Sequence, residues 1–377
     1  MKVSVLQDKL AQGLNIVSRA VSQRSTLPVL SHVLVATDEG RLRLSATDLE
    51  LGISCWIGAK IQEEGSTTVP ARTFTELIST LPAQQVDMSL TVRTQTLNVH
   101  SGTSNTNLKC IDSQEFPPMP VPDVSQGISI NIADLKEMIH QVAFAASKDE
   151  ARPVLTGVLV DLNGSQITLA AADRFRLSQR RAELSAPVPR PIRAVVPARA
   201  LTELARVASD GDQTLTMLLP PGRGQVIFRL RDIEIISQLI EGAYPDYEQI
   251  VPRSYRTRSV ISTAAMLKAC KQVEIFARQG SHIARLNIAS GGELKPGTVE
   301  ISGQSDEVGF SQMTVDASIE GPDLLIAFNV GYMREVLDVI KTPNVALETS
   351  MDNTPGVLRA IGQENFLYVI MPMHLGS

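Results

Sequence analysis

The chain has few of the residues that mark disulfide, metal or base-stacking chemistry. Its three cysteines, Cys55, Cys110 and Cys270, have neither disulfide nor metal-binding spacing, so we expect them to be small buried side chains. Aromatic residues make up only 4% of the chain, which argues against a stacking platform for single-stranded nucleic acid. No apolar run is long enough to span a membrane, and the N-terminus has no signal-peptide pattern. We therefore expect a cytoplasmic protein with no membrane partner.

Motifs for catalysis are also missing. The histidines lie far apart without HxH or HExxH spacing, and no Gly-x-Ser-x-Gly nucleophile motif occurs. Pro220–Gln225 lacks the Lys-Ser/Thr of a phosphate-binding loop, and we interpret it as a hairpin turn. Asp48 and Glu50 are expected on one face of a strand, but the second copy of this segment has Phe175 in place of the second carboxylate. We predict a protein that is not an enzyme and uses neither metal nor cofactor.

The net charge of −5 argues, by the usual rule, against nucleic-acid binding. Binding depends on the local field, however, and an acidic protein can present one basic face to phosphates while its remaining surface keeps it soluble. The composition therefore leaves DNA binding open.

The sequence nearly repeats itself. Leu27–Val35 returns as Arg152–Val160, and Val69–Leu77 returns as Val196–Leu204 with Val-Pro-Ala-Arg in common. Two matched blocks in the same order, at about the same spacing, indicate duplication of a domain-sized unit. The chain is therefore predicted to consist of serial copies.

A third, weaker copy is predicted near the C-terminus. We match Leu286 with Val158 and Asp306 with Asp173, while Phe328–Leu337 replaces the Val-Pro-Ala-Arg block. The longer separation of the later match predicts an enlarged hairpin turn over residues 291–297. Three units of about 126 residues then fill the chain. The predicted domains are residues 1–125 (N-terminal), 126–253 (central) and 254–377 (C-terminal).

Each unit is predicted to contain two amphipathic helices and antiparallel hairpins. In the first helix, apolar residues recur every three or four positions at Leu6, Leu10, Leu14, Val17 and Val21, and basic residues lie outside this stripe. The fold class is therefore α+β, with three tandem copies of two helices packed on antiparallel sheets. Head-to-tail interfaces between such copies either run on as a filament or close into a ring.

Taken together, the residues closely resemble the bacterial sliding clamp family, the beta subunits of DNA polymerase III. The resemblance covers the whole chain and rests on Arg24–Pro28, Ala46–Glu50, Thr68–Arg72, Tyr244–Tyr247 and above all Tyr368–Leu375. It implies three copies of the DNA-clamp domain per chain and a head-to-tail ring homodimer around double-stranded DNA of any sequence. Such a ring is a processivity factor in DNA replication and has no catalytic role.

The resemblance also implies three sets of contact residues. Lumen contacts to DNA phosphates are expected from Arg24, Arg72, Lys148, Arg152 and Arg199. A partner-peptide groove is expected to use Leu155, Ala172, Arg174, Phe175, Arg176, Leu177, Pro245, Gln249, Ile250, Val369, Ile370, Met371, Pro372, Met373 and His374. The dimer interface is expected at Leu108, Ile275 and Phe276, whereas Thr106 is polar where some members have an aromatic residue.

The implied partners are the catalytic subunit of the replicative polymerase, the clamp loader, and other polymerases, ligase and mismatch-repair proteins that carry short clamp-binding peptides. The implied location is the cytoplasm, in association with the nucleoid. Ala172–Leu177 and Gln249 depart from commoner residues of the family, which alters the expected peptide preference. Two other interpretations remain at this point: a repeat scaffold that binds proteins without encircling DNA, and an enzyme with carboxylates brought together from different units.

Overall fold

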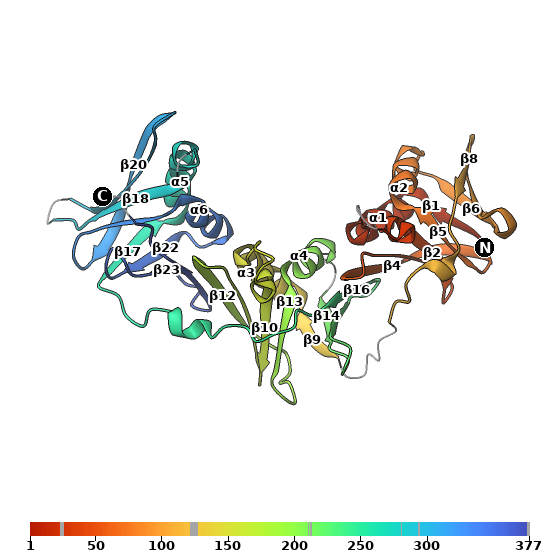
Figure 1. The fold of residues 1–377 in the computed structure, drawn as a ribbon, viewed down its shortest axis with the longest axis horizontal. Coiled ribbons are helices and arrows are strands. Elements are labelled where there is room, and N and C mark those ends of the chain that lie inside the picture. The colour runs from red at the N-terminus through yellow and green to blue at the C-terminus, as the bar shows by residue number, and fades with distance from the viewer. Residues whose placement is uncertain are drawn as a thin grey trace. The chain divides into compact units, whose positions relative to one another are not determined.

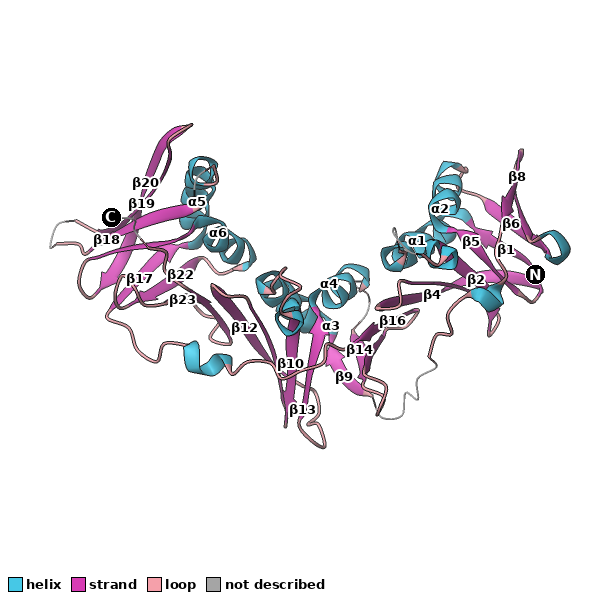
Figure 2. Ribbon diagram, in the orientation of Figure 1, coloured by secondary structure: helices cyan, strands magenta, loops and turns pink. Residues whose placement is uncertain are grey.

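The computed structural model describes residues 1–22, 26–120, 127–209, 211, 213–279, 281–292 and 295–374. Within them, one arrangement of eight strands and two helices occurs three times in chain order (Figures 1 and 2). All paired strands are antiparallel, and the helices lie against the sheets, as the α+β prediction requires.

The bounds of the elements make the repetition explicit. The first copy comprises β1 (Lys2–Leu6), α1 (Gln7–Val17), β2 (His32–Asp38), β3 (Arg41–Thr47), β4 (Leu51–Glu63), β5 (Ser66–Pro70), α2 (Ala71–Thr80), β6 (Gln85–Thr91), β7 (Thr96–Ser101) and β8 (Ser104–Lys109). The second comprises β9 (Ile128–Asn131), α3 (Ile132–Val142), β10 (Gly157–Asn163), β11 (Gln166–Ala172), β12 (Arg176–Glu183), β13 (Ile192–Pro197), α4 (Ala198–Val207), β14 (Thr214–Leu218), β15 (Gln225–Arg229) and β16 (Ile233–Gln238). The third comprises β17 (Thr257–Ser262), α5 (Thr263–Ala277), β18 (Ile283–Ala289), β19 (Gly297–Ser305), β20 (Gly309–Glu320), β21 (Leu324–Asn329), α6 (Val330–Val339), β22 (Asn344–Thr349), β23 (Gly356–Ala360) and β24 (Phe366–Ile370).

The chain divides into two compact units, because the strands of the middle copy are shared between two sheets. The first unit, residues 1–133 and 203–239, holds a 12-stranded sheet in which β16 pairs with β4. The second unit, residues 134–202 and 240–377, holds another 12-stranded sheet in which β12 pairs with β24. A hydrogen-bonded sheet therefore runs continuously from one copy into the next within each unit.

The amphipathic stripes point into the cores as predicted, with shifted ends. Leu10, Leu14 and Val17 of α1 are fully buried, but Leu6 ends strand β1 and is 56% exposed. The second helices follow directly after Pro70 and Pro197. In the third copy no proline stands there, and the Asn329 side chain instead accepts a hydrogen bond from the Tyr332 N–H at 3.2 Å.

The proposed strand position of Asp48 and Glu50 is wrong. β3 ends at Thr47, and the Asp48 carboxylate accepts the backbone N–H groups of Glu50 (3.1 Å) and Leu51 (2.8 Å). Asp173 accepts those of Phe175 and Arg176 in the same way. A turn stabilised by its own carboxylate, not a pair of catalytic carboxylates, explains why an acidic residue stands here.

Strand register also corrects two matches of the third copy. Ile283 pairs with Asn329 and Gly157 with Pro197, each partner directly preceding a second helix, so Leu286 corresponds to Val160 and not to Val158. The Ser305 hydroxyl accepts the Glu307 N–H, as Asp173 does for Phe175, so Ser305 and not Asp306 takes the place of Asp173. The enlarged turn is confirmed, since β18 and β19 form a hairpin across residues 290–296.

The cysteines follow their predicted burial in two cases of three. Cys55 and Cys270 are buried, which raises the pKa of their thiols to about 11 and about 12, but Cys110 is half-exposed. None of the helices in the described ranges is both long and apolar enough to cross a membrane.

Candidate functional site

The floor of the predicted peptide groove is an apolar cluster between β10, β11, β12 and β24. Leu177 lies opposite Val369 in the paired strands β12 and β24, and Ala172 and the half-buried Leu155 join the same cluster. Leu177 and Val369 are 0% and 1% exposed, so they shape the floor rather than offer surface themselves.

Two tyrosines of the connection between the second and third copies complete this floor. The Tyr244 hydroxyl accepts the backbone N–H of Ala172 at 2.9 Å, and the Tyr247 hydroxyl accepts the Gln179 amide at 3.0 Å. Burial raises the pKa of both tyrosines, so both hydroxyls stay protonated at neutral pH. Their structural role is absent from the predicted site; the proline-flanked Tyr-Pro-Asp-Tyr was its only signal in the sequence.

Arg176, beside the predicted groove, is held by several polar contacts. It is only 7% exposed, and its Nε donates to Asp173 at 3.1 Å while its terminal nitrogens donate to Glu335 and to the Phe144 carbonyl. Its guanidinium also lies 4.1 Å from the centre of the Tyr332 ring. Burial lowers the pKa of Arg176, but the neighbouring Tyr368 and Glu335 outweigh it, so the net shift is upward. The residue therefore joins the β11–β12 turn to helix α6 rather than serving as a free peptide contact.

Exposed apolar side chains stand above this ion-pair network. Phe175 is 47% exposed and stacks on Tyr332 with ring centres 6.5 Å apart. The Phe175 carbonyl accepts the Met371 N–H at 2.8 Å, and Met371 is itself 37% exposed. An aromatic ring and a thioether held together by the backbone suit the apolar anchors of a short peptide.

Polar and apolar residues of the rim remain open to solvent. Pro245 and Gln249 are exposed, and the Gln249 amide donates to Asp246 at 2.8 Å. Ile250 is 49% exposed, and Arg174 forms an exposed ion pair with Asp149 at 3.3 Å. Gln249 and Arg174 therefore already have polar partners in the absence of a peptide.

The C-terminal residues divide between different surroundings. Ile370 is fully buried in the core of the third copy. Pro372 and Met373 are half-buried, and the Met373 N–H donates to the Ala327 carbonyl at 2.8 Å. His374 lines a separate cavity of about 280 Å³ with Arg285 and Phe310. Of the predicted segment, Val369 therefore belongs to the buried apolar floor, and Met371 offers an exposed apolar side chain.

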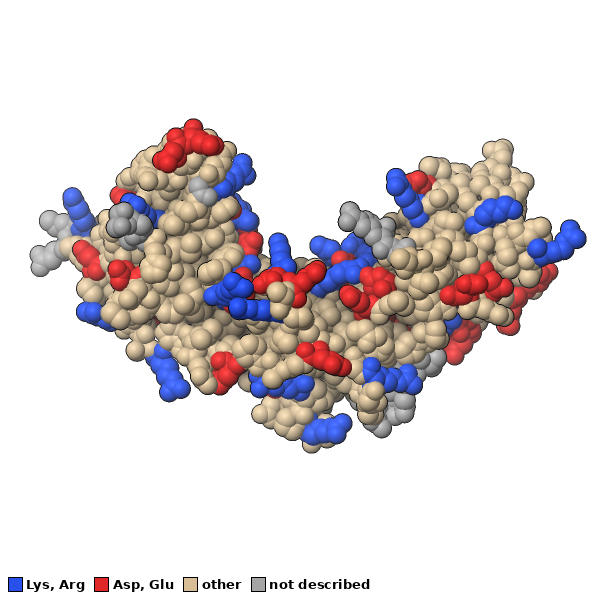
Figure 3. Space-filling view, viewed as in Figure 1, with Lys and Arg blue, Asp and Glu red and all other residues tan. Residues whose placement is uncertain are grey.

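The predicted phosphate contacts are on the surface in both units. Arg72 of α2 is exposed and pairs with Glu76 at 2.9 Å. Lys148, Arg152 and Arg199 are exposed in the second unit, and Arg24 lies outside the described residues. Over the visible surface, basic and acidic side chains are interspersed among a larger area of uncharged residues (Figure 3). The described basic residues are accessible, but Arg72 already has an acidic neighbour.

The predicted dimer residues differ in exposure. Leu108 of β8 is only 8% exposed, whereas Ile275 of α5 is 56% exposed and Phe276 is half-buried. Among the described strands, β8 pairs only with β7, so its outer edge is open. Ile275 offers apolar surface, and β8 offers backbone hydrogen-bonding groups.

Three serial α+β copies with a continuous sheet across each junction define a clamp-type repeat protein. Family models of the DNA polymerase III beta subunit match the chain over residues 1–120 (N-terminal domain), 129–246 (central domain) and 248–374 (C-terminal domain). The chain belongs to this family, the beta sliding clamps.

Individual relatives agree over their full lengths. The chain is 31% identical over 380 residues to the beta sliding clamp of Synechococcus elongatus, covering 100% of both chains. It is 30% identical over 383 residues to that of Bacillus subtilis, covering 99% of both. The crystal structure of the Bacillus subtilis sliding clamp superposes with a TM-score of 0.92 at 28% identity, covering 100% of both chains. A Pseudomonas aeruginosa sliding clamp bound to griselimycin superposes with a TM-score of 0.91 at 28% identity, again over 100% of both.

The chain is therefore a DNA sliding clamp, a non-catalytic processivity subunit that works with DNA and a DNA polymerase. The comparisons favour this interpretation over a scaffold that never encircles DNA.

The network around Arg176 predicts a large effect of one substitution. Arg176→Met removes the largely buried guanidinium that joins Asp173, Glu335 and the Phe144 carbonyl, so the free energy of unfolding should fall by about 3 kcal/mol. The matched control Arg174→Met removes an exposed pair and should change it by no more than about 0.5 kcal/mol. Urea unfolding monitored by circular dichroism measures both, and equal losses would contradict the structural role of Arg176.

Proposed function

We propose that two copies of the chain join head to tail into a ring around duplex DNA and present the groove described above to partner peptides. The observation that carries the proposal is a strand junction that occurs twice within the chain and is left open once. The proposal includes the three domains at residues 1–125, 126–253 and 254–377 and a location at the nucleoid in the cytoplasm.

Both internal junctions use the same pair of elements. The last strand of one copy pairs antiparallel with the long strand after the β-turn of the preceding copy: β16 with β4, and β24 with β12. The corresponding elements without such a partner are β8, the last strand of the first copy, and β20, the long strand of the third. Among the described strands, β20 pairs with β19, and only its end at Ala317–Glu320 also pairs with β17. Two open edges of matching type support pairing of β8 with β20 of a second chain.

The internal registers predict how these edges meet. Ile235 lies opposite Ile53 in the first junction, and Tyr368 lies opposite Ser178 in the second. In the first copy, Thr106 of β8 takes the place of Ile235 and Tyr368, because β8, β16 and β24 pair in the same way with the strands that precede them. In the third copy, Ser311 of β20 takes the place of Ile53 and Ser178 for the same reason. The same register brings Leu108 opposite Gly309, where the absence of a side chain leaves room for leucine. A hydroxyl at Thr106 suits the facing Ser311, which accounts for a polar residue at this point of the joint.

Helix positions support the same arrangement. Arg19, Phe144 and Ile275 are equally distant from the starts of α1, α3 and α5. Arg19 pairs with Glu203 of the next copy's second helix at 3.0 Å, and the Phe144 carbonyl accepts Arg176, which also binds Glu335. Ile275 therefore occupies the position that faces the following copy, consistent with an apolar dimer contact.

Encirclement needs no base-specific contact. Lys and Arg side chains that touch phosphates weakly hold DNA of any sequence and still allow sliding, and the net charge of −5 discourages tight attachment elsewhere. Arg24, Arg72, Lys148, Arg152 and Arg199 are the proposed contacts. The proposed partners are the polymerase catalytic subunit, the clamp loader, and other polymerases, ligase and mismatch-repair proteins that insert short peptides into the groove.

Retention on DNA tests the ring. Clamps loaded on a nicked circular duplex should stay bound through gel filtration. They should be lost when the circle is cut, because a closed ring can slide off the free end of linear DNA. Equal retention on circular and linear DNA would exclude encirclement. Light scattering that finds only monomers at micromolar concentration would also count against the ring.

A disulfide tests the register of the joint. Facing residues of antiparallel strands have Cα atoms about 4.5–5.5 Å apart, a separation that a disulfide spans. With Cys110 replaced by serine, Thr106→Cys combined with Ser311→Cys should give a covalent dimer under mild oxidation. The control pair Asn105→Cys with Ser311→Cys places the thiols on opposite faces and should not crosslink. The reverse pattern on a denaturing gel would overturn the proposed register.

Substitution of the apolar anchors tests the groove. Phe175→Ala and Met371→Ala should each weaken binding of a polymerase-derived clamp-binding peptide by about tenfold or more in fluorescence anisotropy, since both side chains offer apolar contact area. Met351→Ala, at a methionine 48% exposed outside the predicted groove residues, serves as the matched control. Unchanged affinity in both groove variants would refute the assignment.

A further inference from the structure

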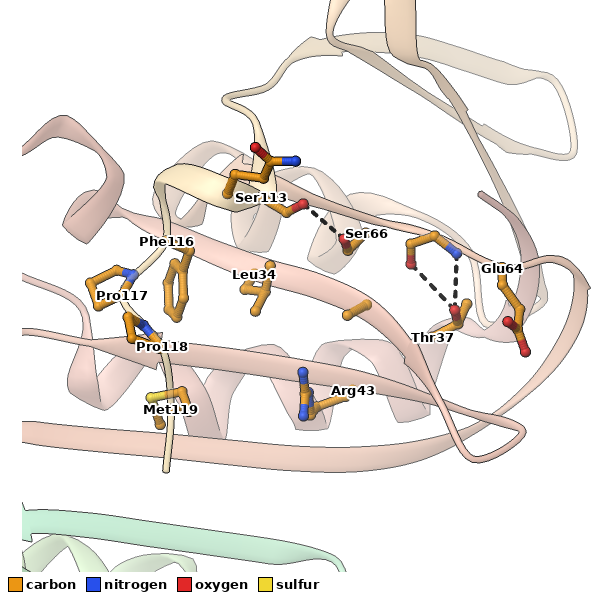
Figure 4. Close-up of a pocket in the computed structure, with 13 residues that line it drawn as sticks. Leu34, Thr37, Arg43, Glu64, Ser66, Ser113, Phe116, Pro117, Pro118 and Met119 are labelled. Atoms are coloured by element: carbon orange, nitrogen blue, oxygen red, sulfur yellow. Dashed lines mark hydrogen bonds between the residues drawn. The ribbon is translucent and has the colours of Figure 1, made fainter. Parts of the chain in front are cut away.

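The first unit contains an open pocket of about 690 Å³ that none of the proposed contact residues lines (Figure 4). It lies between the sheet strands β2, β3 and β5 and the segment that leaves the first copy. Its lining residues are Leu34, Ala36, Thr37, Arg43, Glu64, Gly65, Ser66, Ser113, Gln114, Phe116, Pro117, Pro118 and Met119. Its volume is in the range of pockets that bind small ligands or short peptide segments.

One end of the pocket is apolar. Leu34 and the buried Phe116 belong to one apolar cluster, and Met119 packs against it. Pro117, Pro118 and Met119 form the wall on the left of Figure 4. This wall is closely fitted to the sheet, because a Cβ at Gly52 would lie only 2.7 Å from the Met119 methyl carbon. The apolar end is therefore a packed, preformed surface.

The other end has a cation with unused hydrogen-bonding capacity. Arg43 Nη1 lies 3.4 Å from the Asp38 carboxylate, whose Oδ2 already accepts the Trp56 indole N–H at 2.7 Å. Arg43 Nε is buried and has no hydrogen-bond partner among the described residues. A guanidinium has five donors, and a donor left buried and unpaired is destabilising. The Arg43 side chain is 31% exposed, so an anionic acceptor from a ligand reaches its terminal nitrogens rather than the buried Nε and adds a partner to a poorly satisfied guanidinium.

The first copy differs from the other two in the pair of residues beneath the pocket. Ala36 pairs with Arg43 across β2 and β3. The corresponding pairs are Asp161 with Thr168 in the second copy and Asn287 with Glu300 in the third. Only the first copy combines a small residue with a cation, which leaves space above Ala36 and a positive charge beside it. The pocket is therefore a departure from the repeat and not a consequence of it.

We propose that this pocket is a second protein-docking site of the clamp, which takes an extended peptide segment with an acidic side chain between apolar ones. The carboxylate binds Arg43, and an apolar neighbour packs on Leu34, Phe116 and Met119. Ser66 and Ser113, whose hydroxyls lie 2.8 Å apart, supply polar contacts to the peptide backbone. The site shares no residue with the groove at Phe175 and Met371, so it does not depend on that assignment.

Trp56 gives a local measurement, because it is the only tryptophan of the chain and shares Asp38 with Arg43. The full-length clamp is titrated with the blocked peptide acetyl-Ile-Asp-Ile-amide while tryptophan emission is recorded. A saturable change in emission is expected. The isosteric peptide acetyl-Ile-Asn-Ile-amide should bind at least about tenfold more weakly, since a charge-assisted hydrogen bond is replaced by a neutral one.

Variants of the protein complete the test. Arg43→Gln should weaken the acidic peptide by about tenfold or more, whereas Arg93→Gln, at an exposed arginine of the first copy that does not line the pocket, should leave its affinity unchanged. Equal binding of the acidic and amide peptides to the unmodified clamp would overturn the proposal even if Arg43→Gln failed to fold. No saturable change up to about 10 mM peptide, a concentration at which even millimolar binding saturates, would overturn it as well.

Discussion

The structure depends on the pairing of strands across each junction between copies. Strand β4 finds it in β16, and β12 finds it in β24, so the backbone hydrogen-bonding groups of one copy are satisfied by the next. An open antiparallel edge invites pairing with another chain, and the proposed ring uses for this the same type of junction that joins the copies. Serial repetition with this type of junction has two outcomes, a closed ring or a filament. A ring of the proposed kind would pair β8 and β20, the two junction strands that have no such partner within the chain.

How much the sequence predicts is clear from particular elements. The buried stripe of Leu10, Leu14 and Val17 was predictable because helical periodicity alone specifies it. The turn at Asp48 was not predictable, because a carboxylate that accepts hydrogen bonds from nearby backbone N–H groups leaves no periodic pattern in the sequence. From the sequence alone, Asp48 looks like one of two catalytic carboxylates. Phe175 and Leu177 lie only two positions apart among the predicted groove residues, yet Leu177 forms the buried floor and Phe175 is exposed. The role of Tyr244 was missed because it depends on a hydroxyl meeting a backbone N–H 72 positions away in the chain.

Divergence among the copies gives each junction its own chemistry on a common backbone. The first junction has the ion pair Arg19–Glu203, partly open to solvent. The second encloses Arg176 among carboxylates and aromatic rings. A buried charge destabilises the fold little while all its partners are present, but the loss of one partner is strongly destabilising. The second junction therefore depends more strictly on its particular side chains than the first. Strict positioning suits the second junction because the exposed Phe175 and Met371, the proposed peptide anchors, are joined by a backbone hydrogen bond next to it.

The same reasoning explains why the outer faces of the copies are not equivalent. In the first copy, Met119 lies where any side chain at position 52 would clash, so the chain's own connection covers that part of the face. In the second, Tyr244 and Tyr247 bind the floor through their hydroxyls and leave Ile250 exposed above it. A connection that packs on its sheet through apolar side chains covers that part of the sheet and leaves open only the pocket beside it, whereas one fixed through buried hydroxyls leaves exposed apolar surface above it. The position of a few side chains in these connections, and not the fold of the copies, therefore decides how much apolar surface each face exposes.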